Sequence, residues 1–131
     1  MVEIHAYSKA ASGDKQLSAH FKVREFACGD GSDAVLVAPR LVMVLETIRS
    51  LFCAPVVIRS AYRTPQYNAK VNGAAHSQHC YGMAADISIK GQTPAAVAAF
   101  ARTLMPDWGG VGVYDSFCHI DVREAKADWK G

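Results

Sequence analysis

The chain has 131 residues, of which half are hydrophobic and a fifth are charged. This ordinary globular composition argues against disorder beyond the two ends, and roughly two thirds of the unfolded surface can be buried without help from a disulfide or a metal. The net charge of +2 comes from basic residues scattered singly, which argues against a nucleic-acid partner.

The first half of the chain predicts an edge strand, a core helix and a buried strand. Residues 1–16 alternate apolar and polar side chains before a glycine turn, which is typical of an edge strand. A proline followed by apolar residues at helical spacing predicts the main amphipathic helix over about 39–52. The β-branched run at 55–58 predicts a short buried strand, with a loop over 60–64.

The second half predicts two further helices and three strands. In chain order these are a helix over 64–72, a loop over 74–83, a strand over 84–89, a helix over 93–105, and a hairpin over 111–114 and 117–122. No repeat or linker divides the sequence, so we expect a single domain over 1–131. Because strands and helices do not alternate regularly, we expect an α+β fold, with a small antiparallel sheet and flanking helices.

The four cysteines contain no CxxC pair, so they indicate neither a zinc ribbon nor a compact disulfide framework. Cys80 and Cys118 each stand beside a histidine, which leaves a thiolate ligand open. If 117–122 is a strand, however, Cys118 and His119 point to opposite faces. This alternation favours Cys118 as a small core residue.

Three side chains are candidates for a metal site. A catalytic zinc site takes about three protein ligands from imidazole nitrogen and carboxylate oxygen, and leaves a position for water. Of the five histidines, His79 and His119 stand next to predicted elements, and Asp86 follows His79 across a glycine-bearing loop. Spacing alone leaves two interpretations open: a His-Asp-His metal site, or a locally paired aspartate with two half-buried histidines.

A family resemblance bears on this choice. Residues 77–86 read Ser-Gln-His-Cys-Tyr-Gly-Met-Ala-Ala-Asp and match the pattern S-x-H-x-x-G-x-A-x-D at every specified position. The segment 60–65 with Asn68, and the segment 110–121 around His119, resemble two further motifs of the same family. The chain is therefore similar, over about 18–123, to the zinc D-alanyl-D-alanine carboxypeptidases and related peptidoglycan endopeptidases, which include phage endolysins and share a fold with the amino-terminal hedgehog domain.

The resemblance implies zinc (Zn2+) on His79, Asp86 and His119, and implies that Arg63 faces the substrate. Zinc lowers the pKa of bound water to about 7 and polarises a carbonyl. A fixed guanidinium can then hold a substrate carboxylate or stabilise the developing oxyanion.

The general base is left with two candidates. Related enzymes place an acidic residue or a histidine shortly before the last metal-binding histidine, and only Asp115 carries a carboxylate there. Asp121 shares a strand face with His119, where it either orients the imidazole by a hydrogen bond or acts as the base itself. Ser77 and Tyr114 could contact substrate, or could serve only the turn and the hairpin.

These residues indicate zinc-dependent hydrolysis of a peptidoglycan peptide, by trimming a terminal D-alanine or by cutting within the stem or cross-bridge. The alternative is a catalytically silent domain of the same fold that binds peptide or protein, for instance in a phage particle. We find neither a signal-peptide pattern nor a membrane-spanning run. We therefore expect a protein made in the cytoplasm or stripped of an export signal, which acts at the cell wall or in the periplasm and is encoded by a phage or prophage. The sequence does not indicate an oligomeric state, and we assume a monomer.

Overall fold

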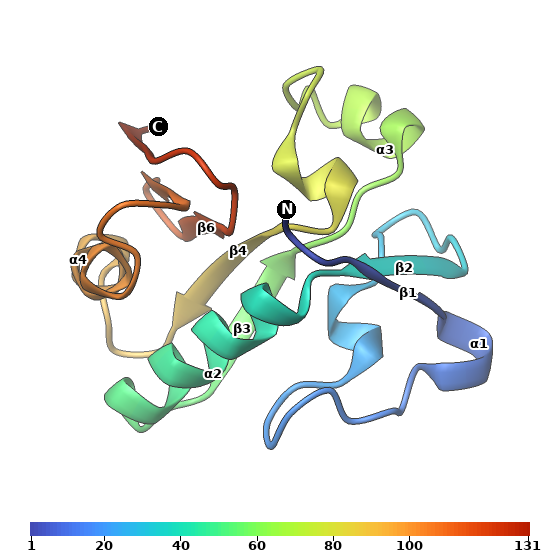
Figure 1. Ribbon diagram of the computed structural model, residues 1–131, viewed down its shortest axis with the longest axis horizontal. Coiled ribbons are helices and arrows are strands. Elements are labelled where there is room, and N and C mark those ends of the chain that lie inside the picture. The colour runs from blue at the N-terminus through green and yellow to red at the C-terminus, as the bar shows by residue number, and fades with distance from the viewer.

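A five-stranded sheet in the order β3-β4-β6-β5-β7 forms the centre of the computed structural model, which describes residues 1–131 (Figure 1). The antiparallel pairs are β3–β4, β4–β6 and β5–β6, whereas β5 and β7 are parallel. The α+β class predicted from the sequence is confirmed. The strands are β3 (Val56–Ser60), β4 (Ala84–Ile89), β5 (Gly110–Val113), β6 (Cys118–Asp121) and β7 (Ala127–Lys130).

Two helices pack against one face of this sheet. They are α2 (Pro39–Phe52) and α4 (Pro94–Leu104), and each begins at a proline, whose fixed φ suits the first helical turn. The apolar sides of both helices and the residues of β3, β4, β5 and β6 that face them form one buried core, together with apolar residues of the amino-terminal third. Phe52 at the end of α2 meets Phe100 of α4 edge to face, so the two helices also contact each other.

The amino-terminal third adds a second, smaller sheet. Its antiparallel strands are β1 (His5–Ser8) and β2 (Ala34–Val37), and they are accompanied by α1 (Lys9–Ser12) and the 3-10 helix η1 (Val23–Phe26). The strand predicted within 1–16 is present as β1. Its partner β2 was not predicted, because its four residues lead almost directly into α2 and show no alternation of their own.

The remaining helices lie between β3 and β4: α3 (Pro65–Lys70) and the 3-10 helix η2 (Gln78–Tyr81). The predicted helix starting near 64 and the predicted strand over 84–89 are both present. The predicted loop over 74–83 contains η2, and β7 was not predicted at all. No helix of the structure combines the length and apolar character needed to cross a bilayer.

Candidate metal centre

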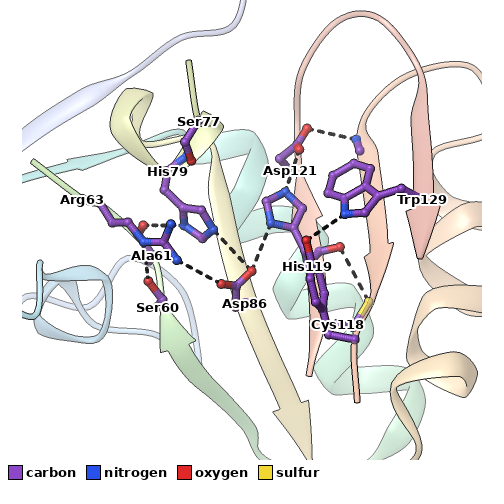
Figure 2. A network of polar contacts seen from close by, with 12 residues as sticks. Ser60, Ala61, Arg63, Ser77, His79, Asp86, Cys118, His119, Asp121 and Trp129 are labelled. Carbon is purple, nitrogen blue, oxygen red and sulfur yellow. Dashed lines mark hydrogen bonds and ion pairs between the residues drawn. The ribbon is translucent and has the colours of Figure 1, made fainter. Parts of the chain in front are cut away.

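The sheet face opposite α2 and α4 carries polar side chains. On β4, Ala85 and Ile87 belong to the buried core, so Asp86 between them points to the other face. On β6, Cys118 belongs to the core, and His119 shares the face of Asp86. The register pairs Asp86 directly with His119, so the two side chains come together across neighbouring strands (Figure 2).

His79 reaches the same point from η2, and the local motif explains how. Ser77 caps η2, where its hydroxyl accepts a hydrogen bond from the His79 backbone N–H at 3.2 Å. Gly82 ends η2 with φ of 75°, and a Cβ there would lie 2.6 Å from the Leu36 carbonyl oxygen of β2. The serine and glycine of the motif therefore turn the chain from His79 into β4.

The hydrogen bonds of both imidazoles orient a nitrogen lone pair toward Asp86. His79 Nδ1 lies 2.7 Å from the Ala61 carbonyl oxygen, which can only accept, so Nδ1 carries the proton and Nε2 of the neutral ring is free. His119 Nε2 lies 2.8 Å from Asp121 Oδ2, and Nδ1 lies 3.0 Å from Asp86 Oδ1, so a neutral ring that donates to Asp121 turns its Nδ1 lone pair toward Asp86. In its neutral form each histidine can therefore offer one ring nitrogen to a metal ion.

These atoms fit a bound metal ion. Asp86 Oδ1 lies 3.3 Å from His79 Nε2 and 3.0 Å from His119 Nδ1, and the three ligand atoms all lie within 4.8 Å of one another. Ligands of a tetrahedral zinc ion stand roughly 3.3–3.6 Å apart. All three side chains are buried, and a metal ion among these atoms would take the place of the imidazole protons that otherwise pair with the Asp86 carboxylate.

The pKa values agree with a site that attracts positive charge. Burial would raise the pKa of Asp86, but its contacts with His119 and His79 outweigh burial and hold the pKa well below its usual range. Burial would lower the pKa of His119, but Asp121 and Asp86 raise it. The carboxylate is thus ionised at neutral pH, as metal ligation requires.

Arg63 lies beside this group. Its Nη2 is 3.5 Å from Asp86 Oδ2, and its Nε donates to Ser60 Oγ at 3.1 Å (Figure 2). Its Nη1 donates to Asn68 Oδ1 at 3.3 Å. Ser60 faces Asp86 because β3 shifts register between Ile58 and Ser60. Sequence analysis gave Asn68 no role, although its place in the family motif was the available signal. The structure makes it one of the two side chains that hold Arg63.

Asp121 is buried behind His119. Its carboxylate accepts from His119, from Arg123 Nη2 at 2.6 Å and Nε at 2.8 Å, and from the Gly110 backbone N–H at 3.0 Å. Burial would raise the pKa of Asp121, but the hydrogen bonds from Arg123 and His119 hold it well below its usual range. This geometry suits a residue that orients His119. Arg123 was missed at the sequence level, since a single arginine two residues after Asp121 carries no spacing signal.

The three candidate metal ligands line a cavity of about 410 Å³. Arg63, Ser77 and Tyr114, the three residues predicted to meet substrate, all line it, as does His76. Asp115 lies exposed in the β5–β6 turn and is not part of the lining. Asp86 is therefore the only carboxylate in the cavity wall, and Asp115 and Asp121 stay predictions as candidate bases.

The thiolate alternative does not fit. Cys118 is fully buried within the apolar core, on the opposite face from His119, and burial raises the pKa of its thiol to about 12. Burial also raises the pKa of Cys80. Neither sulfur belongs to the group of converging ligand atoms.

A family model described as Peptidase M15 matches residues 19–121, which include all three candidate ligands and Arg63. The chain belongs to the peptidase M15 family. The resemblance to the zinc D-alanyl-D-alanine carboxypeptidases is thereby confirmed, and M15 membership supports a metallopeptidase acting on a peptide substrate. M15 peptidases are typically zinc-dependent, and His79, Asp86 and His119 form a group that could hold the ion. A search of the curated proteins found no match to this M15 chain.

Proposed function

We propose that this M15 chain hydrolyses peptide bonds of peptidoglycan in a zinc-dependent reaction. The observation that carries the proposal is the convergence of two imidazole nitrogens and one carboxylate oxygen in a cavity beside a fixed arginine. Bound there, zinc would supply an activated water and polarise the scissile carbonyl.

The chain's own residues would position the peptide. The guanidinium of Arg63 is held by Ser60 and Asn68, and its side chain is only 16% exposed. A preorganised arginine at the edge of the cavity suits a planar carboxylate, such as that of a terminal D-alanine or of an acidic stem residue. We propose that the substrate presents such a carboxylate to Arg63. We also propose that the enzyme acts at the cell wall and is encoded by a phage or prophage.

The test uses purified peptidoglycan and the zinc-loaded protein. We expect release of free D-alanine or of new amino termini by the wild type, and a loss of at least about 100-fold in His79→Ala and in Asp86→Ala. His5→Ala is the matched control, because His5 lies on β1, outside the cavity. Equal product release by His79→Ala and wild type would refute the zinc mechanism.

Asparagine variants test the candidate bases. Because Asp115 lies outside the cavity, we expect Asp115→Asn to keep activity within a factor of about two, as is usual for an exposed substitution. A loss of about 100-fold or more in Asp115→Asn would instead make this residue the proton acceptor.

A second function is favoured by one observation, the lack of any carboxylate in the cavity wall besides Asp86. Such a cavity suits a domain that holds zinc and binds a wall peptide without cutting it. Calorimetry distinguishes the two functions. Zinc-dependent binding of a peptide ending in D-alanyl-D-alanine, with no cleavage over a day, would favour the binding domain.

A further inference from the structure

One row of residues crosses the site face of the five-stranded sheet. Read from β3 to β7 in register, the row is Ser60, Asp86, His119, Gly112 and Trp129. Neighbouring strands lie about 4.8 Å apart, so Trp129 is two strands away from His119. Gly112 between them has no side chain, and the indole reaches over it until its ring centroid lies 4.9 Å from that of His119 (Figure 2).

Close packing holds the indole of Trp129 in this position. A Cβ on Gly112 would lie 2.5 Å from the indole ring, so only glycine leaves room for it. The guanidinium of Arg123 lies 5.4 Å from the ring centroid, within cation–π range. The indole is therefore fixed between the sheet, the candidate metal ligand His119 and a charged side chain.

Trp129 in turn fixes a hydroxyl of the cavity wall. Its Nε1–H donates to the Tyr114 hydroxyl oxygen at 2.9 Å. The Tyr114 ring stacks on Phe117 with centroids 4.5 Å apart and an angle of 13° between the planes, and Gly131 packs against the same ring. Tyr114 lines the cavity of the metal group, and its own hydroxyl proton has no acceptor within the protein.

We propose that the Tyr114 hydroxyl donates a hydrogen bond to the scissile carbonyl oxygen of the substrate, and that Trp129 is the residue that positions it. The indole N–H occupies one acceptor site of the phenolic oxygen, which leaves the O–H to donate elsewhere. A neutral donor fixed near a polarised carbonyl stabilises the negative charge that develops on that oxygen. The inference rests on the proposed peptidase function.

The hydrogen bond between Trp129 and Tyr114 depends on a strand outside the family match. The matched residues end at 121, whereas β7 and Trp129 lie beyond them. Tyr114 lies within the match, but the partner that orients its hydroxyl does not. We therefore expect β7 to be part of the catalytic cavity rather than only an edge of the sheet.

The test is a double-mutant cycle measured on a soluble wall peptide that the wild type cleaves. We expect Tyr114→Phe to lower kcat about 100-fold while KM stays within a factor of about two, because the bond acts mainly in the transition state. Trp129→Phe keeps a ring beside His119 but loses the donor, so kcat should fall about tenfold. The double variant should be no slower than Tyr114→Phe, because Trp129 acts through the hydroxyl that Tyr114→Phe has already removed.

Zinc content and thermal unfolding are measured in every variant, so that a folding defect is recognised. Trp108→Phe is the matched control: Trp108 lies against Arg40, away from the cavity, and its kcat should stay at the wild-type value. Losses that multiply in the double variant would mean that Trp129 acts only by packing on His119. Wild-type kinetics in Tyr114→Phe, or a raised KM with unchanged kcat, would overturn the donor role.

Failure of the proposed function itself would be visible separately. If the wild type cleaves no wall peptide, the donor is tested by the affinity of the zinc-loaded protein for a phosphinate analogue of the same peptide, whose tetrahedral oxygens carry the charge of the transition state. A rise of about fivefold or more in the Kd of this analogue for Tyr114→Phe would support the hydrogen bond to the negatively charged oxygen. Equal Kd values would overturn it.

Discussion

At the scale of single residues, Asp121 shows how a buried charge orients a candidate metal ligand. Its side chain is fully buried, and its two oxygens accept hydrogen bonds from His119, Arg123 and the Gly110 backbone. A buried carboxylate is tolerated because every one of these partners compensates for its lost hydration. The same bonds determine which nitrogen of His119 is left to face Asp86.

Asp121→Asn should therefore cost stability and metal affinity together. We expect the free energy of unfolding to fall by about 3 kcal/mol, since a buried ion pair loses one partner, and zinc affinity to fall roughly 10–100-fold. Denaturant unfolding and zinc titration measure the two effects.

The matched control for Asp121→Asn is Asp128→Asn, which removes an ion pair with Arg102 that is about 40% exposed on both sides. Such a surface pair contributes about 0–1 kcal/mol, and the change should leave zinc affinity intact. If Asp121→Asn binds zinc as tightly as Asp128→Asn does, the orienting role is refuted.

At the scale of elements, two glycines of β5 make room for side chains of its two neighbouring strands, β6 and β7. Gly110 lies opposite Asp121, and a Cβ there would come within 2.3 Å of its Oδ2 atom. Gly112 leaves the space that the indole of Trp129 fills. Gly110 thus makes room for the Asp121 carboxylate, and Gly112 makes room for the indole of Trp129.

Gly112→Ala should be costly only while Trp129 is present. The added methyl group overlaps the indole, so we expect a loss of about 1–3 kcal/mol in unfolding free energy and altered tryptophan emission. In a Trp129→Ala background the space is empty, and the same change should cost less than about 0.5 kcal/mol. Equal costs in the two backgrounds would contradict this packing.

At the scale of the whole molecule, the candidate metal site links segments that are far apart in the chain. His79 comes from η2, Asp86 from β4, and His119 from β6, 33 residues after Asp86. A ligand that binds only the folded arrangement stabilises the whole fold by linkage. Stability should therefore depend on metal concentration.

We expect zinc at 100 times its Kd to stabilise the protein by about 2.7 kcal/mol and to raise Tm by roughly 8–15 °C. A chelator should reverse the shift, and His79→Ala should abolish it. Differential scanning calorimetry at several zinc concentrations measures the effect. A Tm that does not change with zinc in the wild type would contradict the metal centre.

Local patterns predicted much of this structure. The helix over 39–52 and the motif from Ser77 to Asp86 depend on residues within one or two turns of each other, where a cap, a glycine turn and strand alternation act directly. The candidate ligands, Arg63 and the cavity position of Tyr114 could thus be predicted without a structure, helped by the family resemblance. The single domain and the catalytic role of each residue stay predictions.

Only the tertiary structure decided the partners of these residues. It determined that Asp86 faces His119 across two strands, that Arg123 holds Asp121, and that Trp129 reaches His119 over Gly112. Strand order and register depend on contacts between distant segments, which leave no periodic trace in either segment alone. For this reason the chemistry of the metal ligands was readable from the sequence, whereas the surroundings that orient them were not.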